Sequence, residues 1–146
     1  MRRFIKGRIV LQLVLLLVVA ILVGGCGTDS KPAQDELKPW KIGFVAPLSG
    51  PAASIGQYEL KGIEIGLAKI NSEGGIHGRK LELLVEDDQT NPSNTVVAVK
   101  KLVEDEKIDI LMGPLLTNMA LPAIPIVEKN EMPNISHGAG LQVVDP

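Results

Sequence analysis

The chain has few of the residues on which several classes of binding site depend. A single cysteine, Cys26, excludes an intrachain disulfide, and aromatic residues make up only 3% of the 146 residues, so few rings are available to stack on bases or sugars. The sequence contains no G-x-G-x-x-G, P-loop or G-x-S-x-G pattern, so nucleotide binding and serine-hydrolase chemistry have no signature. His77 and His137 lie far apart without cysteine partners, which favours a turn residue and a loop residue over a zinc site.

The first 25 residues have the pattern of an export signal. Four cations and no acid precede an almost wholly apolar run at residues 9–23, and small residues follow it. This succession is typical of a secretory signal peptide, and the run is short for a spanning helix, which needs about 20 apolar residues. The alternative is an uncleaved anchor helix with an incidental thiol at Cys26. Both interpretations place the rest of the chain outside the cytoplasmic membrane.

The sequence around the only cysteine resembles the lipobox of bacterial lipoproteins and reads Leu22-Val23-Gly24-Gly25-Cys26. The resemblance implies transfer of diacylglyceryl to Cys26, cleavage before it and acylation of the new amino group. Two or more acyl chains would give a stable anchor on a bacterial membrane, either the cell membrane or the periplasmic side. We expect residues 26–40 to be a flexible, lipid-anchored linker, because they are polar and lack an apolar period.

The balance of charge changes once residues 1–25 are set aside. The chain holds 15 Lys and Arg and 17 Asp and Glu; residues 1–25 contain four of these cations and none of the acids, so the remainder carries 11 against 17, a formal charge of −6. An acidic body outside the cytoplasm argues against nucleic acid as a partner. The 45% apolar content suffices for the core of one modest domain or of part of a larger one.

From residue 41 onward, segments with the apolar spacing of strands alternate with segments with the apolar spacing of helices. Short apolar runs predict strands at residues 41–46, 80–86, 108–112 and 132–136, with the second at a sheet edge because it alternates. Helical spacing predicts helices between these strands. Successive βα units indicate an α/β fold for residues 41–146: an open, Rossmann-like parallel sheet in the order 2-1-3-4 with helices on both faces.

Local signals fix several details of the predicted helices. Asn91-Pro92 is expected to cap the second helix, and Thr117-Asn118 to cap the third. Pro122 and Pro125 fall early in the third helix, so we expect irregular backbone near Leu121 and regular helix only from about Ala123 to Asn130.

Three loops follow strands at the carboxyl edge of the predicted sheet, the edge where open α/β sheets bind ligands. They are residues 47–52, 113–118 and 136–140. They offer the hydroxyls of Ser49, Thr117 and Ser136 and backbone N–H groups at helix starts, which suit a carboxylate or another small anionic or polar group. The other interpretation is that Gly and Ser are present only as loop formers.

Three acids, Glu86-Asp87-Asp88, end the second predicted strand. Adjacent carboxylates can bind a metal or act as acid and base, and an enzyme using Asp87 and Asp88 would show metal-dependent turnover. No third ligand lies near in sequence, so we interpret the acids as a solvated strand end. We predict no catalytic residue, metal or cofactor.

Several stretches, in order, resemble the branched-chain amino-acid-binding proteins of ABC transporters. They are Lys-Ile-Gly-Phe-Val-Ala-Pro-Leu-Ser-Gly-Pro from Lys41, Ile-Asn-Ser-Glu-Gly-Gly-Ile-His-Gly-Arg up to Arg79, Glu-Asp-Asp-Gln from Glu86, and Met-Gly-Pro from Met112. The resemblance implies a type I periplasmic-binding-protein fold, in which two α/β lobes close on a ligand and the closed form docks on a permease. The implied function is extracytoplasmic binding of branched-chain or related amino acids or small amides for import.

The resemblance also implies ligand contacts. Thr117 matches the hydroxyl residue that contacts the α-carboxylate, Ile55 falls where an aromatic residue often lies over the ligand, and Ala139 and Gly140 match a backbone-and-hydroxyl pair. Weaker candidates are Ser49, Asn118 and Ser136. Ile55 lacks a ring and Gly140 stands where Thr is frequent, so other small acids, amides or peptides stay open as ligands.

The chain is also short for this family, whose members are more than twice as long. We expect residues 41–146 to be part of the first lobe only, from a truncated reading frame, a fragment or a split gene. The second lobe would supply the acid that pairs with an α-ammonium group. The alternatives to a transport protein are the ligand-sensing lobe of an extracytoplasmic receptor, which shares the fold, and a non-functional truncated fragment.

Overall fold

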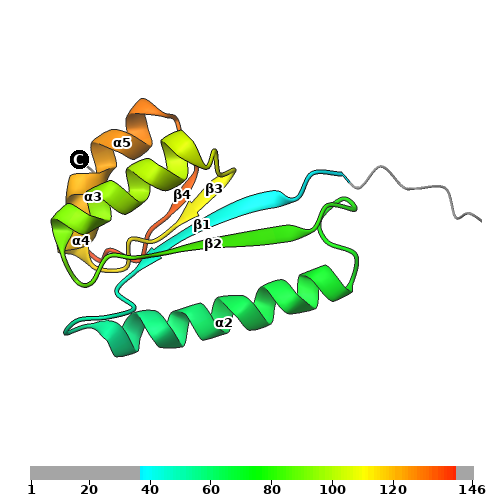
Figure 1. The fold of residues 1–146 in the computed structure, drawn as a ribbon, viewed down its shortest axis with the longest axis horizontal. Coiled ribbons are helices and arrows are strands. Elements are labelled where there is room, and N and C mark those ends of the chain that lie inside the picture. The colour runs from blue at the N-terminus through cyan, green and yellow to red at the C-terminus, as the bar shows by residue number, and fades with distance from the viewer. Residues whose placement is uncertain (1–36, 141–146) are drawn as a thin grey trace, which may run out of the picture. The chain divides into compact units, whose positions relative to one another are not determined.

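The computed structural model describes residues 37–140 (Figure 1). The predicted signal peptide, Cys26 and residues 26–36 of the expected linker lie outside the described residues, as do residues 141–146. Among the described residues, no helix combines the length and the apolar character needed to cross a membrane.

Four parallel strands form one sheet in the order β2-β1-β3-β4, as predicted. The strands are β1 (Trp40–Ala46), β2 (Leu81–Asp87), β3 (Ile110–Met112) and β4 (Asn134–Ile135). β1 and β2 pair along their full lengths, from Trp40 opposite Leu81 to Ala46 opposite Asp87. β2 lies at one edge of the sheet, as its alternating sequence predicted.

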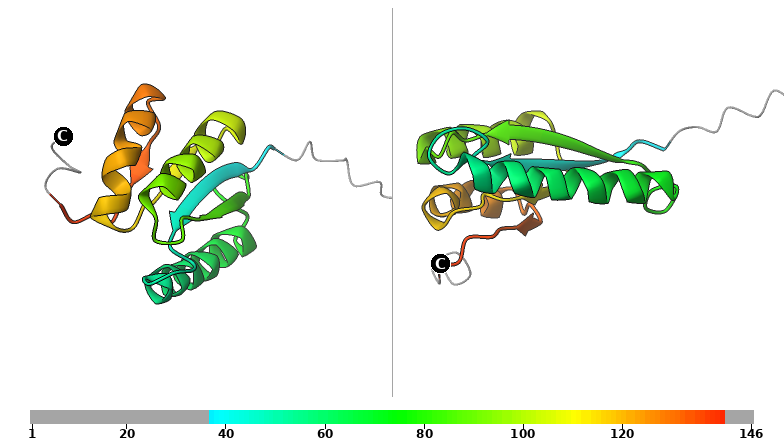
Figure 2. Two further views of the ribbon diagram at one scale, coloured as in Figure 1. Left: turned by 60° about the vertical axis from the view of Figure 1, so that its left-hand side comes forward. Right: turned by 90° about the horizontal axis from the view of Figure 1, so that it is seen from below.

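Helices cover both faces of this sheet, also as predicted. They are α2 (Ala53–Ser72), α3 (Pro92–Lys100) with a π-helical turn η1 (Lys101–Asp105), and α4 (Thr117–Ala120), the 3-10 turn η2 (Leu121–Ala123) and α5 (Ile124–Lys129) in succession. Figure 2 shows α2 on one face, and α3 and α5 on the other. The irregular backbone expected near Leu121 is the η2 turn, where Pro122 interrupts the α-helix.

The ends of these helices follow local chemistry in one case and depart from it in another. The Asn91 side chain accepts the N–H of Ser93 at 2.8 Å, with Pro92 at the first helical position, so the predicted cap of α3 is confirmed. The predicted cap of α4 is wrong, because Leu116 occupies the cap position and Thr117 is the first helical residue. The Thr117 hydroxyl is therefore available for another contact.

The core is divided by the sheet into two parts. Under α2, Phe44 and Ala46 are fully buried together with Leu115. On the opposite face, Val45 packs in a second cluster with residues of α3 and β3. Neighbouring residues of β1 thus point to opposite faces, and both are covered along this strand. The two clusters, one on each face of the sheet, thus hold the ends of the central strands in place.

Candidate ligand site at the carboxyl edge of the sheet

The three predicted loops lie at the same edge of the sheet, because they follow strands β1, β3 and β4, which run parallel. Figure 1 shows α2, α3 and α4 starting at this end, at the left of the view. We call residues 47–52, 113–118 and 136–140 the carboxyl-edge loops. They split into a β1 loop that is held by β2, and two loops that are held by each other.

The β1 loop is braced by the carboxylate of Asp87. Oδ1 accepts the backbone N–H groups of Leu48 at 2.8 Å and Ser49 at 3.2 Å, and also the N–H of Gln89 at 2.8 Å. Oδ2 accepts the Ser49 hydroxyl at 2.6 Å. Thr90 adds a second brace, since its Oγ1 accepts the N–H of Ala52 at 3.2 Å. The Ser49 hydroxyl is thereby committed to the loop rather than presented to a ligand.

These contacts shift the ionisation of Asp87. Burial acts to raise the pKa of this carboxyl, but the hydrogen bonds from the Ser49 hydroxyl and from the N–H groups of Gln89, Leu48 and Ser49 outweigh it together. The pKa is consequently lowered from its ordinary value of 3.8. Asp87 is therefore a stable anion at neutral pH, as a brace for N–H donors requires.

Asp88, the next residue, is fully buried. Its Oδ1 accepts the N–H of Thr90 at 2.8 Å, while its Oδ2 has no hydrogen-bond partner among the described residues. Burial raises the pKa of Asp88; the Thr90 N–H opposes this and the negative charge of Asp87 adds to it. The interpretation of these acids as a solvated strand end is wrong, because both aspartates hold the backbone that follows β2.

The loops after β3 and β4 are tied to each other. The Ser136 hydroxyl donates to the carbonyl of Pro114 at 3.0 Å, and the Asn134 amide donates to the carbonyl of Gly113 at 3.1 Å. Gly113 has a φ of 91°, and a Cβ on it would lie 2.2 Å from the Val45 carbonyl oxygen. Only glycine permits this close approach of β3 to β1 at the start of the loop.

Thr117 and Gly140 are brought together, although 22 residues separate them in the sequence. The N–H of Gly140 donates to Oγ1 of Thr117 at 3.1 Å. A hydroxyl has one donor and two acceptor sites, and within residues 37–140 the Thr117 hydroxyl donates to no protein acceptor. In this part of the chain, that hydrogen stays free for a further acceptor. The Gly140 N–H, by contrast, is used within the site.

Within residues 37–140, none of the other candidate residues has a hydrogen bond to this pair. Ile55 is 52% exposed in the first turn of α2, and Asn118 is exposed in the first turn of α4. Ala139 is exposed beside Gly140. A hollow of about 530 Å³ beside α5 and β4 is lined by Ser136 but not by Thr117, so it is separate from the Thr117–Gly140 pair.

Two features of this edge were not found from the sequence. One is the brace formed by Asp87 and Thr90. The other is a contact between loop and helix, in which Nδ1 of His137 lies 3.0 Å from Oε1 of Glu59 on α2. The adjacent acids at the end of β2 were a visible signal for the first, but their partners depend on strand pairing. No local pattern indicated the second.

A family model for periplasmic binding proteins matches residues 39–144. The chain belongs to the periplasmic binding protein family. This binding protein is 38% identical over 107 residues to the Leu/Ile/Val-binding protein of Escherichia coli K12, and 35% identical over 107 residues to that of Citrobacter freundii. Each alignment covers 73% of this chain and 29% of the relative. The chain thus spans less than a third of the length of these relatives.

Solved structures give the same fold for this binding protein. The substrate-binding protein LivJ of Streptococcus pneumoniae, in complex with isoleucine, has a TM-score of 0.66 and 29% identity over 68% of this chain and 29% of LivJ. A solute-binding protein from Rhodopseudomonas palustris, in complex with 3,4-dihydroxybenzoic acid, has a TM-score of 0.63 and 29% identity over 73% of this chain and 29% of its own. These relatives are solute-binding proteins rather than enzymes, and the family places the domain outside the cytoplasm.

Proposed function

We propose that the chain forms the first ligand-binding lobe of an extracytoplasmic protein that delivers a small solute to the permease of an ABC importer. The leading solute is a branched-chain or related amino acid, and small amides are the second class. The observation that carries the proposal is the Thr117 hydroxyl, which the Gly140 N–H orients at the carboxyl edge from 3.1 Å.

The ligands of the relatives support a carboxylate as the group that this hydroxyl takes. Isoleucine and 3,4-dihydroxybenzoic acid occupy related proteins of the same fold, and they share a carboxyl group but little else. A hydroxyl that donates to a carboxylate makes a charge-assisted hydrogen bond. Ile55, exposed at the start of α2, is suited to contact the apolar part of a ligand. This division of roles is common to small-molecule sites.

The ligand needs a second lobe for tight binding. A closed site buries most of a small ligand's surface, and one lobe leaves the other side of the ligand in water. Each charged hydrogen bond that is missing costs about 1.5–3 kcal/mol, and each ~1.4 kcal/mol is tenfold in affinity. The described loops alone should therefore bind amino acids in roughly the millimolar range, if a two-lobe protein binds them in the micromolar range.

The experiment compares leucine with leucinamide, which has the same side chain but no carboxylate, by chemical-shift titration of the full chain. Thr117→Val removes the hydroxyl at nearly constant shape. It should weaken leucine binding by about 10–100-fold, as expected for one charge-assisted hydrogen bond, and leave leucinamide binding almost unchanged. Isoleucine, valine and 3,4-dihydroxybenzoate extend the series to other carboxylates.

Ser93→Ala is the matched control, since Ser93 offers an exposed hydroxyl in the first turn of α3, at the same edge but outside the three loops. It should change neither affinity. Equal weakening of leucine and leucinamide by Thr117→Val would show that the hydroxyl shapes the loop rather than binding the carboxylate. Micromolar leucine binding by the chain alone would contradict the need for a second lobe.

We further propose that the chain is anchored by lipid at Cys26. The support is the lipobox-like sequence before this residue and the export-signal pattern of residues 1–25. Cys26→Ala should abolish metabolic labelling with fatty acid and leave an unprocessed chain of higher mass. Cys26→Ser, which also lacks a thiol, should behave in the same way. Unchanged mass and unchanged membrane retention in both variants would favour an uncleaved anchor helix.

A further inference from the structure

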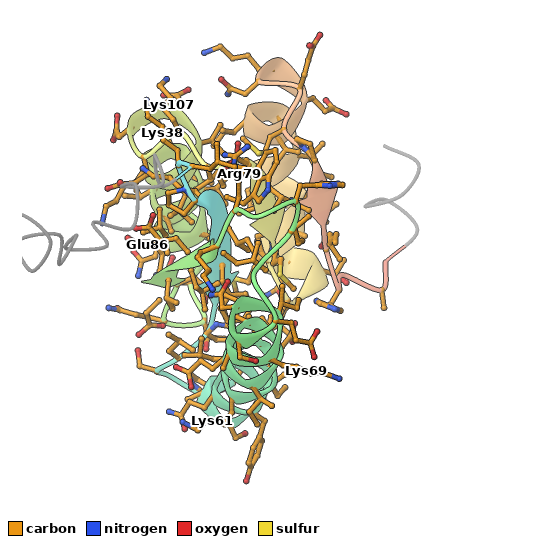
Figure 3. The ribbon with its side chains drawn as sticks, turned by 90° about the vertical axis from the view of Figure 1, so that its right-hand side faces the viewer. Lys38, Lys61, Lys69, Arg79, Glu86 and Lys107 are labelled. Carbon is orange, nitrogen blue, oxygen red and sulfur yellow. The ribbon has the colours of Figure 1, made fainter. Side chains whose placement is uncertain are left out.

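A group of cations lies at the opposite, amino edge of the sheet. Lys38, Lys41, Arg79 and Lys107, which precede or begin the first three strands, line a hollow of about 430 Å³. We call these four residues the cationic edge. Figure 3 looks onto this end of the molecule and shows Lys38, Arg79 and Lys107 near one another, with Lys61 far from them. None of these residues belongs to the candidate ligand site.

The positive charge of this edge is only partly balanced by nearby acids. Among residues 37–140, the lysines in ion pairs are Lys61, Lys100, Lys101 and Lys129. The cationic edge donates instead to neutral carbonyls: Lys41 Nζ to Glu106 at 2.9 Å, and Arg79 Nε to Lys38 at 2.6 Å. The hollow has two acids, Glu82 and Asp109, against its four cations.

This excess contrasts with the rest of the described domain. Residues 37–140 contain 10 Lys and Arg and 13 Asp and Glu, a net charge of −3, while the residues lining the hollow carry a net charge of +2. Charge is therefore segregated toward the amino edge rather than scattered. A surface of this kind attracts an anionic partner even though the domain as a whole is acidic.

An aromatic residue completes the edge. The Arg79 guanidinium carbon lies 3.3 Å from the centroid of the Trp40 ring, and Trp40 is the only tryptophan of the chain. The indole nitrogen of Trp40 is buried and has no hydrogen-bond partner among residues 37–140, so Trp40 serves as a fluorescent reporter of this edge and is not counted as a headgroup contact. The position in the chain is also suitable. Only 10 residues lie between Cys26 and Leu37, and covalent geometry limits the span of these 11 steps to about 40 Å.

Resting on the lipid anchor at Cys26, we propose that the cationic edge lies on an anionic phospholipid surface and contacts lipid phosphates. Attraction to such a surface acts within a Debye length of about 8 Å. The chain between Cys26 and Leu37 permits any distance up to ~40 Å, so the cationic edge can come within this range of the bilayer. Each cation near an anionic surface strengthens adsorption about fivefold. The adsorbed orientation directs the carboxyl-edge loops away from the bilayer, since they lie at the other end of the same strands.

Trp40 supplies the measurement. The full chain, expressed in a bacterium that processes lipoproteins, is reconstituted into vesicles of phosphatidylglycerol and phosphatidylcholine or of phosphatidylcholine alone. Each contains a headgroup-spin-labelled lipid that quenches nearby tryptophan. Quenching should be strong only in the anionic vesicles and should fall at high salt. Lys38→Gln with Lys107→Gln should weaken adsorption roughly 25-fold, fivefold for each cation, and reduce quenching to that in phosphatidylcholine.

Lys61→Glu is the control, because it also makes the net charge more negative by two and lies away from the edge. It should leave quenching unchanged. Equal quenching in the two kinds of vesicle, or an equal effect of Lys61→Glu, would overturn the proposal. A chain that fails to float with phosphatidylcholine vesicles refutes the lipid anchor instead. The cationic edge is then judged by salt-sensitive flotation with anionic vesicles and its loss in the double variant.

Discussion

Asp87→Ala should loosen the β1 loop and destabilise the domain. The carboxylate accepts four hydrogen bonds, but only the bond from the Leu48 N–H is partly buried; the bonds from Ser49 and Gln89 are exposed. Water can replace the exposed bonds, whereas the partly buried one is worth about 1.5–3 kcal/mol because the acceptor is charged. We expect a loss of about 2–3 kcal/mol in the free energy of unfolding, or roughly 10–20 °C in melting temperature.

The assay is urea unfolding followed by circular dichroism, with Asp109→Ala as the control. Asp109 also accepts a backbone N–H with its carboxylate, that of Lys41 at 2.8 Å, but this single bond is exposed at the amino edge. Its loss should cost under about 1 kcal/mol. Equal costs for the two variants would refute the argument that Asp87 holds the loop. A double-mutant cycle of Asp87→Ala with Ser49→Ala then measures the 2.6 Å contact alone.

The pH dependence provides an independent check on Asp87. Its folded pKa is lowered from 3.8, so its stabilising contribution is complete above the unfolded pKa and is lost as the pH falls through the lower folded pKa. In strong acid, wild-type protein should therefore lose the stability that the Asp87 carboxylate contributes. The Asp87→Ala variant lacks this contribution already at neutral pH. The two unfolding free energies should converge as the pH falls below 3.8 and through the lower folded pKa. A difference that stays constant as the pH falls below 3.8 would show that the charge of Asp87 is unimportant.

Two further predictions concern other parts of the fold. Gly113→Ala should cost more than about 2 kcal/mol in the free energy of unfolding, because the added Cβ would meet the Val45 carbonyl. Gly66→Ala should instead stabilise the domain by about 0.5–1 kcal/mol, because Gly66 lies within α2 and its added Cβ would meet no other atom. Thermal melts that rank the two variants in the opposite order would contradict this. Asp88 has a raised pKa, so its contribution to stability should increase as the pH falls from neutral through that pKa toward 3.8. Asp88→Asn should remove this increase, and an unchanged pH profile in urea unfolding would argue against it.

The sequence was sufficient for the elements whose signals are local. The strand period of residues 41–46, the Asn91-Pro92 cap and the prolines after Leu121 each act over a few residues, and the structure has the corresponding strand, cap and 3-10 turn. The end of α3 was harder to predict from the sequence. It finishes in a π-helical turn, at Lys101–Asp105, and the N–H of Ile108 then donates to the carbonyl of Leu102. Packing decides such an ending, because propensity alone does not distinguish it.

The same division applies to the candidate site. Parallel strands place their carboxyl ends at one edge, so the approach of residue 117 to residue 140 could be expected from topology. The bracing role of Asp87 could not, because it depends on the register that sets this residue opposite Ala46, beside the start of the β1 loop. Register arises from tertiary pairing. The roles of Thr117, Ile55, Ala139 and Gly140 in ligand binding stay predictions.

The brace at Asp87 has a consequence for how such a lobe can acquire specificity for a different ligand. The shape of the β1 loop is held by a carboxylate and a hydroxyl from the neighbouring β2 segment, through bonds that end mainly on backbone N–H groups. The side chain of Ile55, which is exposed in the first turn of α2, makes none of these hydrogen bonds. Substitutions there can alter recognition while the backbone is preserved, so descendants of one scaffold can diverge toward different solutes without rebuilding the loop.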